Sequence, residues 1–196
     1  MRNTLLAIAG AALLGSTPAA AAKFSPDWTS LQLGTGIASF ARAPIRDNAT
    51  PAVAYDLRLT VGTRFPIAFE AAYVGSFARE HDAFAPDPGV TSNALTGSAR
   101  VNLTTWRVQP FIVGGAGWVN LHSYGRDQAP EAAANFAHDS NGGIFPVGGG
   151  LAGYLGRHGM IEARASYDFL VGVKDFTNQN IRPDMWEATI GGGYAF

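Results

Sequence analysis

The sequence predicts an all-β fold, an eight-stranded antiparallel up-and-down transmembrane β-barrel. Three observations lead to this prediction. Apolar and polar residues alternate with a period of two within several segments. Short connections between these segments alternate with long ones, and the chain is rich in glycine and poor in charged residues. Of the 196 residues, 24 are Gly and 15% are charged; globular proteins average about 7% and 25%. Because successive side chains of a strand face opposite sides, each segment has an apolar and a polar face.

Composition also excludes several kinds of function. The 14 Lys and Arg residues are balanced by 15 Asp and Glu, so the chain lacks the cationic excess that binds nucleic acid. It contains no Cys, which rules out disulfides, thiolate metal sites and a cysteine nucleophile. We therefore expect no nucleic-acid partner. The stretch Gly148–Gly153 satisfies the G-x-G-x-x-G pattern of dinucleotide-binding proteins, but no helix is predicted there, so we expect no cofactor either.

The amino terminus has the order of a secretory signal peptide. Arg2 precedes an apolar run from Leu5 to Leu14, and the small residues Ala19–Ala22 follow. The run is about ten residues long, too short for the roughly 20 that a spanning helix needs. We expect a signal peptide over 1–22 and a barrel over 23–196, and no later window is apolar enough for a helical span.

The expected strands, in chain order, run over 29–40, 55–62, 67–74, 95–103, 108–119, 145–155, 161–169 and 186–196. Alternation is clearest in the second, third, fourth, seventh and eighth. In the second, for example, Tyr55, Leu57 and Leu59 interleave with Asp56, Arg58 and Thr60. Glycine dilutes the alternation in the fifth and sixth strands, and it leaves open which of their faces is turned inward.

Connections of two lengths link these strands. Hairpin-length links lie at 63–66, 104–107 and 156–159, whereas longer links rich in Pro, Asp, Asn and Gly lie at 41–51, 79–90, 121–143 and 172–184. Short turns at one end and long loops at the other, with an even number of strands, are typical of bacterial outer-membrane barrels.

The charged residues decide which face is turned inward, because alternation alone does not distinguish a soluble barrel from a membrane barrel. The polar faces carry charges of mixed sign among small residues: Asp56, Arg58, Arg64, Glu70, Arg100, Glu162, Arg164, Asp168 and Glu187. Soluble exteriors usually carry abundant Lys, yet Lys is scarce here. We therefore expect the charges in the lumen and the apolar faces toward lipid.

Aromatic residues near the strand ends agree with this orientation. They resemble the two girdles found at bilayer interfaces, with Phe65, Trp106 and Phe196 on the short-turn side and Phe77, Trp118, Phe145, Phe169 and Trp186 nearer the long loops.

Five of the lumen charges lie three to six residues above the short turns, at about 3.3 Å per residue. We therefore expect one buried layer of ion pairs that plugs the interior, which in an eight-stranded barrel is just wide enough for side chains. Its members are Arg58, Glu70, Arg100, Glu162 and Arg164.

The eight segments, the stretch Pro110–Gly117 and the ending Gly193–Phe196 resemble the small OmpA/OmpX-type outer-membrane β-barrel family, in its barrel domain only. The resemblance implies an outer-membrane location, contact with membrane lipid and lipopolysaccharide, and recognition by the barrel assembly machinery through Tyr194 and Phe196. We expect a non-enzymatic protein with exposed loops and a structural or surface-interaction role; the ligand of the loops is open.

One alternative is an enzyme. The segment His138–Ile144 resembles the H-x-S-N-x-G segment of outer-membrane lipid A deacylases, which implies His138 as general base and Ser140 as nucleophile on a lipid ester. The acid expected about a dozen residues after Ser140 is missing, because Ala152 lies there.

A second alternative is a narrow diffusion pore. A metal site would require His81 of the 79–90 link to converge with His122 and His138 of the 121–143 link, and we expect none.

Overall fold

The computed structural model describes residues 28–42, 46, 50–63, 65–79, 89–124, 139–173 and 183–196. The expected signal peptide lies outside these residues, as do Arg64, His81 and His138. No helix in the described ranges is long and apolar enough to cross a membrane.

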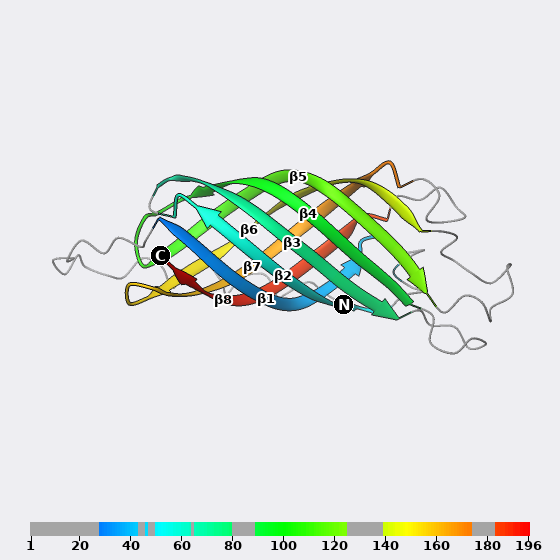
Figure 1. Cartoon of the computed structure of the whole chain (residues 1–196), viewed down its shortest axis with the longest axis horizontal. Coiled ribbons are helices and arrows are strands. Elements are labelled where there is room, and N and C mark those ends of the chain that lie inside the picture. Colours follow the sequence, from blue (N-terminus) through cyan, green and yellow to red (C-terminus); the bar gives the residue numbers. More distant parts are fainter. Residues whose placement is uncertain are drawn as a thin grey trace, which may run out of the picture.

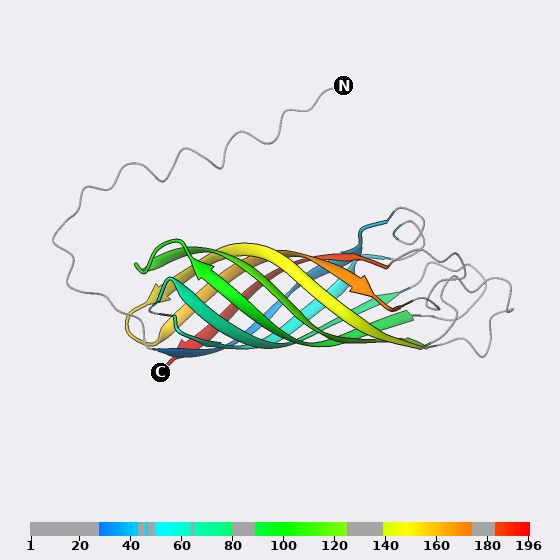
Figure 2. The same ribbon diagram turned by 90° about the horizontal axis from the view of Figure 1, so that it is seen from above.

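Eight antiparallel strands form one closed barrel, each paired with its neighbours in the chain, which confirms the predicted fold class. The strands are β1 (Thr29–Phe40), β2 (Ala52–Val61), β3 (Ile67–Arg79), β4 (Gly89–Asn102), β5 (Val108–Tyr124), β6 (Ser140–Leu155), β7 (Gly159–Val171) and β8 (Met185–Ala195). Figures 1 and 2 show them wound obliquely around a cylinder, with the short turns and the C-terminus at one end.

The first and last strands close the wall. The pairing of β1 with β8 runs from Ser30 opposite Ala195 to Phe40 opposite Met185. At the rim, the N–H of Phe196 donates to the carbonyl oxygen of Thr29 over 2.8 Å, and the N–H of Thr29 donates back over 3.2 Å. This seam leaves no open sheet edge, which a strand-built protein in lipid requires.

The strands extend further toward the long loops than predicted. β1 has the predicted limits, but β2 begins at Ala52 rather than Tyr55, and β4 begins at Gly89 rather than Leu95. The expected loop 121–143 is wrong at both ends, because Leu121 pairs with Ser140 inside the sheet. Backbone pairing with a neighbouring strand continues there through polar and glycine residues that carry no alternation signal.

The outer wall is apolar and the inner wall carries the charges. Residues of β2 alternate strictly between buried and exposed, and large apolar side chains such as Leu33, Leu95 and Ile190 are about two-thirds exposed. Asp56 and Arg58 are buried inside. An apolar surface this extensive is foreign to a soluble monomer and suits a hydrocarbon environment.

Strands β5 and β6, whose facing the sequence left open, follow the same rule. Gln109, Phe111 and Val113 of β5 point inward, as do Ala152 and Tyr154 of β6. The aromatic residues predicted at the two rims are all exposed on the outer wall: Phe65, Trp106 and Phe196 at the turn end, and Phe77, Trp118, Phe145, Phe169 and Trp186 toward the loops.

The interior is layered. An apolar group lies at the turn end, formed by Phe111, Val113, Ala152, Tyr154 and Met160. A larger apolar group fills the loop end, formed by Ala38, Phe40, Ala52, Ala54, Ala78, Val90, Ala94, Val119, Leu121, Ile144, Leu170, Val173 and Met185. The charged layer lies between these apolar groups, and further buried polar side chains lie at both ends of the lumen, among them Gln32 and Gln109 toward the short turns and Ser39 and Asp184 toward the loops.

The β5–β6 seam contains one interruption. Pairing runs from Val108 opposite Gly153 to Gly114 opposite Val147, then resumes in the same register at Gly117 opposite Ile144. Pro146 is the residue opposite Gly115 in that register, and it has no N–H to donate.

The apolar outer wall predicts that the cost of a charged substitution depends on its depth in the membrane. Ile190 lies midway along β8, between the rim residues Trp186 and Phe196, whereas Leu155 ends β6 at a short turn, and both Ile190 and Leu155 point outward. We expect Ile190→Arg to lower the free energy of unfolding by about 2–4 kcal/mol and Leu155→Arg by about 0–1 kcal/mol, because only the first places charge in hydrocarbon. Urea unfolding in lipid vesicles measures both; equal costs would contradict the assigned orientation.

Candidate functional site

Four charged side chains meet across the middle of the lumen. Glu70 comes from β3 and Arg100 from β4, whereas Glu162 and Arg164 both come from β7. In the closed order of eight strands, β3 and β7 lie on opposite walls. All four residues point inward because they occupy the buried positions of their alternating strands. We call this group the tetrad.

The tetrad forms a closed ring of alternating charge. Nη1 of Arg100 donates to Glu70 Oε1 over 3.1 Å and to Glu162 Oε2 over 2.6 Å. Nη2 of Arg164 lies 2.8 Å from both carboxylate oxygens of Glu70 and 2.9 Å from Oε1 of Glu162. Each carboxylate thus contacts both guanidinium groups, which is the pairing that buried charges require.

An aromatic ring supports the two arginines. The guanidinium carbon of Arg100 lies 3.6 Å from the centroid of the Phe111 ring, and that of Arg164 lies 5.0 Å from it. Both distances fall within the range of cation–π attraction. Gly150 on β6 makes room for the ring, because a Cβ there would lie 2.8 Å from Cζ of Phe111.

A further hydrogen-bond chain joins the tetrad to a turn. Nε of Arg100 donates to Oδ1 of Asn102 over 2.7 Å, and Nδ2 of Asn102 donates to the carbonyl oxygen of Phe65 over 2.9 Å. Arg100 therefore connects the lumen charges with the β2–β3 turn.

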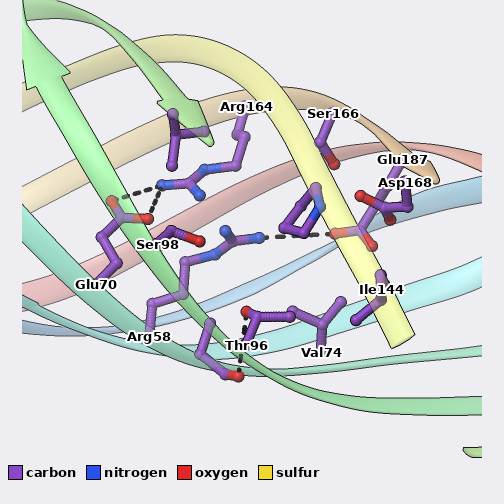
Figure 3. A pocket seen from close by; sticks show the side chains of 13 residues that line it. Arg58, Glu70, Val74, Thr96, Ser98, Ile144, Arg164, Ser166, Asp168 and Glu187 are labelled. Carbon is purple, nitrogen blue, oxygen red and sulfur yellow. Dashed lines mark hydrogen bonds and ion pairs between the residues drawn. The ribbon is translucent and has the colours of Figure 1, made fainter. Parts of the chain in front are cut away.

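Arg58, expected in the same layer, lies in a second group. Its Nε donates to Asp56 over 2.8 Å on the same strand, and its Nη2 lies 3.6 Å from Oε1 of Glu187 on β8. Figure 3 shows Glu187 beside Asp168, with Arg58 reaching toward them. The single five-residue layer is therefore two groups, because Arg58 finds a carboxylate two residues back along its own strand and another on a nearby strand.

The two groups differ in charge balance. The tetrad has two guanidinium groups and two carboxylates, whereas the second group has one guanidinium group and the carboxylates of Asp56, Asp168 and Glu187. A cavity of about 20 Å³ touches both groups (Figure 3). This volume holds about one water molecule.

Five residues in or beside these groups were not assigned to the ion-pair layer from the sequence. Four of them occupy polar strand faces, and that was the available signal for them: Asp56, Asn102, Asp168 and Glu187. Phe111 had no such signal, because the facing of β5 was open.

The other predicted site residues lie apart. Ser140, the first residue of β6, is buried and points into the lumen, whereas His138 lies outside the described residues. His122 is exposed, with its Nδ1 2.7 Å from Asp139. Within the described ranges, no group of three potential ligand side chains is placed to hold a metal ion. Tyr194, of the predicted assembly signal, is exposed on the outer wall.

No family model matches this sequence, and no curated protein matches it. Solved structures do match. Neisserial surface protein A is 12% identical with a TM-score of 0.59, over 86% of this chain and 97% of that one. Ail, the attachment invasion locus protein of Yersinia pestis, is 12% identical with a TM-score of 0.55, over 87% and 99%. Ail in complex with the heparin analogue sucrose octasulfate is 11% identical with a TM-score of 0.56, over 87% and 99%. The chain therefore has the fold of small outer-membrane β-barrel proteins.

The tetrad generates a prediction about stability. Arg100→Ala leaves Glu70 and Glu162 with fewer partners in a water-poor lumen, so we expect the free energy of unfolding to fall by about 3–5 kcal/mol. Urea unfolding of the detergent-solubilised barrel measures this change.

Two variants serve as controls. Arg157 lies exposed in the β6–β7 turn, so Arg157→Ala should change the free energy of unfolding by no more than about 0.5 kcal/mol. Asp168→Asn removes a buried charge that has no ion pair within the described residues, so the barrel should not lose stability. A loss for Arg100→Ala no larger than for Arg157→Ala would show that the tetrad does not stabilise the barrel.

Proposed function

We propose that the protein is a non-enzymatic barrel of the outer membrane whose lumen is closed and whose long loops carry a structural or surface-interaction role. One observation carries this proposal: the tetrad crosses the lumen from wall to wall, with an apolar group on each side of it. A lumen filled in this way offers solutes no route, so function falls to the surfaces outside it.

The outer wall supports the membrane location. Large apolar side chains cover its middle, and exposed aromatic residues lie toward both rims, as in barrels that span a bilayer. The fold shared with Neisserial surface protein A and Ail agrees with this location. Barrel assembly machinery would then read the carboxyl-terminal strand, with Tyr194 and Phe196 on the lipid side.

A role for the loops in binding is part of the proposal. Ail, a barrel of the same fold, has been solved with a heparin analogue. One fold hosts many functions, so the ligand of this chain depends on the sequence of its own loops.

A closed lumen predicts that the protein conducts no ions across a bilayer. We expect the purified protein in a planar bilayer to give no stable conductance steps, because the tetrad crosses the lumen and the cavity that borders it in the described part of the chain is water-sized. A porin added to the same bilayer is the positive control. Reproducible unitary steps would contradict the closed lumen and favour the diffusion pore.

The deacylase alternative is tested by lipid A mass spectrometry with and without the protein. We expect identical lipid A profiles, since Ser140 is buried and faces the lumen rather than the lipid. A deacylated species that appears with the wild-type protein and disappears with Ser140→Ala would overturn the non-enzymatic role and assign the chemistry to Ser140.

A further inference from the structure

Three asparagines form a row on the outside of the wall. Asn93 of β4 is the register partner of Asn120 of β5, which is in turn the partner of Asn141 of β6. β4 and β5 lie side by side on one wall (Figure 1). All three side chains point outward, where the nearby residues Leu95 and Trp118 are apolar or aromatic and exposed. We call these residues the asparagine row.

Hydrogen bonds within the wall use only part of the row. The hydroxyl groups of Tyr55 and Tyr73 donate to Oδ1 of Asn93 over 3.0 and 2.7 Å. Nδ2 of Asn120 donates to Oδ1 of Asn141 over 2.6 Å. Within the described part of the chain, Nδ2 of Asn93, Oδ1 of Asn120 and Nδ2 of Asn141 are left over.

The backbone is shaped to hold this arrangement. Gly75 on β3 is the register partner of both Tyr55 and Asn93. A Cβ at position 75 would overlap the Tyr55 ring. Tyr55 therefore lies across β3 and reaches Asn93 two strands away, so that its ring forms a flat aromatic surface beside the amides.

The spare amide groups call for a polar partner. Hydrocarbon chains accept no hydrogen bonds, so amides facing them would lose the bonds that they make in water. The row carries no cation that would attract a phosphate, and the nearby His122 is paired with Asp139. Hydroxyl and amide groups on a sugar match the spare donors and acceptor, and tyrosine and tryptophan are the aromatics that lie at headgroup level.

We infer that the asparagine row, with Tyr55, Tyr73 and Trp118, binds the sugar headgroup of a glycolipid in the outer leaflet. The row belongs to the loop half of the wall, since Asn93 and Asn141 lie near the loop ends of β4 and β6. This inference rests on the proposed outer-membrane location and names a lipid partner for the wall itself.

Lipopolysaccharide titrated into the purified, detergent-solubilised barrel tests the inference, with retained lipid counted by native mass spectrometry. We expect saturable binding that weakens by about tenfold or more in the double variant Asn93→Leu and Asn120→Leu, because at least two hydrogen bonds are lost. Both leucines face lipid, so the variant should stay folded, and heat-modifiable gel migration verifies this.

The matched control is Thr35→Val. Thr35 also points outward, but its hydroxyl donates to the carbonyl oxygen of Ala54 over 3.1 Å and lies outside the row. The Thr35→Val variant should bind lipopolysaccharide as tightly as the wild type does.

Three outcomes would overturn the inference. They are unchanged binding by the folded double variant, equal displacement by phosphatidylglycerol, and cross-linking of two copies through the row without lipopolysaccharide, which would mark an interface between copies. Recovery of the wild type in the outer-membrane fraction tests the proposed location separately, so the two failures are distinguishable.

Discussion

Closure of the sheet is the constraint on which the other features depend. A strand in hydrocarbon must satisfy every backbone N–H and C=O through its neighbours, and only a sheet that returns to its first strand does so at every position. The β1–β8 seam provides this return, and the pairing of Thr29 with Phe196 carries it to the rim. Once the wall is closed, one set of alternating side chains is outside in lipid and the other is confined inside.

Confinement explains the chemistry of the interior. Eight strands enclose a space that side chains can just fill, so charged residues placed there have few waters to solvate them. They compensate one another instead: the tetrad joins β3 and β4 to β7, and Phe111 covers both of its guanidinium groups. A buried ion pair adds little to the free energy of unfolding compared with an apolar pair of similar size, but removing one partner of the ion pair lowers that free energy strongly. The tetrad therefore selects one arrangement of opposite walls over others.

The sequence predicted most of this architecture because the alternation of apolar and polar residues shows directly which side chains of a strand share a face. Glu70, Arg100, Glu162 and Arg164 fall on polar faces at similar distances from the short turns, and this was enough to bring them together. The same pattern did not show that Arg58 lies in a second group. Whether Arg58 pairs with Glu70 or with Asp56 depends on the direction of its side chain, not on its height along the strand. The apolar group at the loop end of the lumen was missed because alanines such as Ala52, Ala54 and Ala94 carry no signal that distinguishes an inward from an outward face. The asparagine row was missed because it depends on which residues of neighbouring strands lie opposite each other. The sequence of a single strand does not contain this register.

The interruption beside Pro146 gives the wall an uneven stiffness. Everywhere else in the described sheet, neighbouring strands are joined by unbroken pairing, but β5 and β6 lack it at Gly115 and Ala116. The gap lies in the middle of the seam rather than at a rim, and Pro146 also borders the water-sized cavity. Because ladder hydrogen bonds hold neighbouring strands together, the two unpaired positions are the place in the described wall where β5 and β6 separate at the lowest cost in free energy, whereas the tetrad resists separation of β3 from β7.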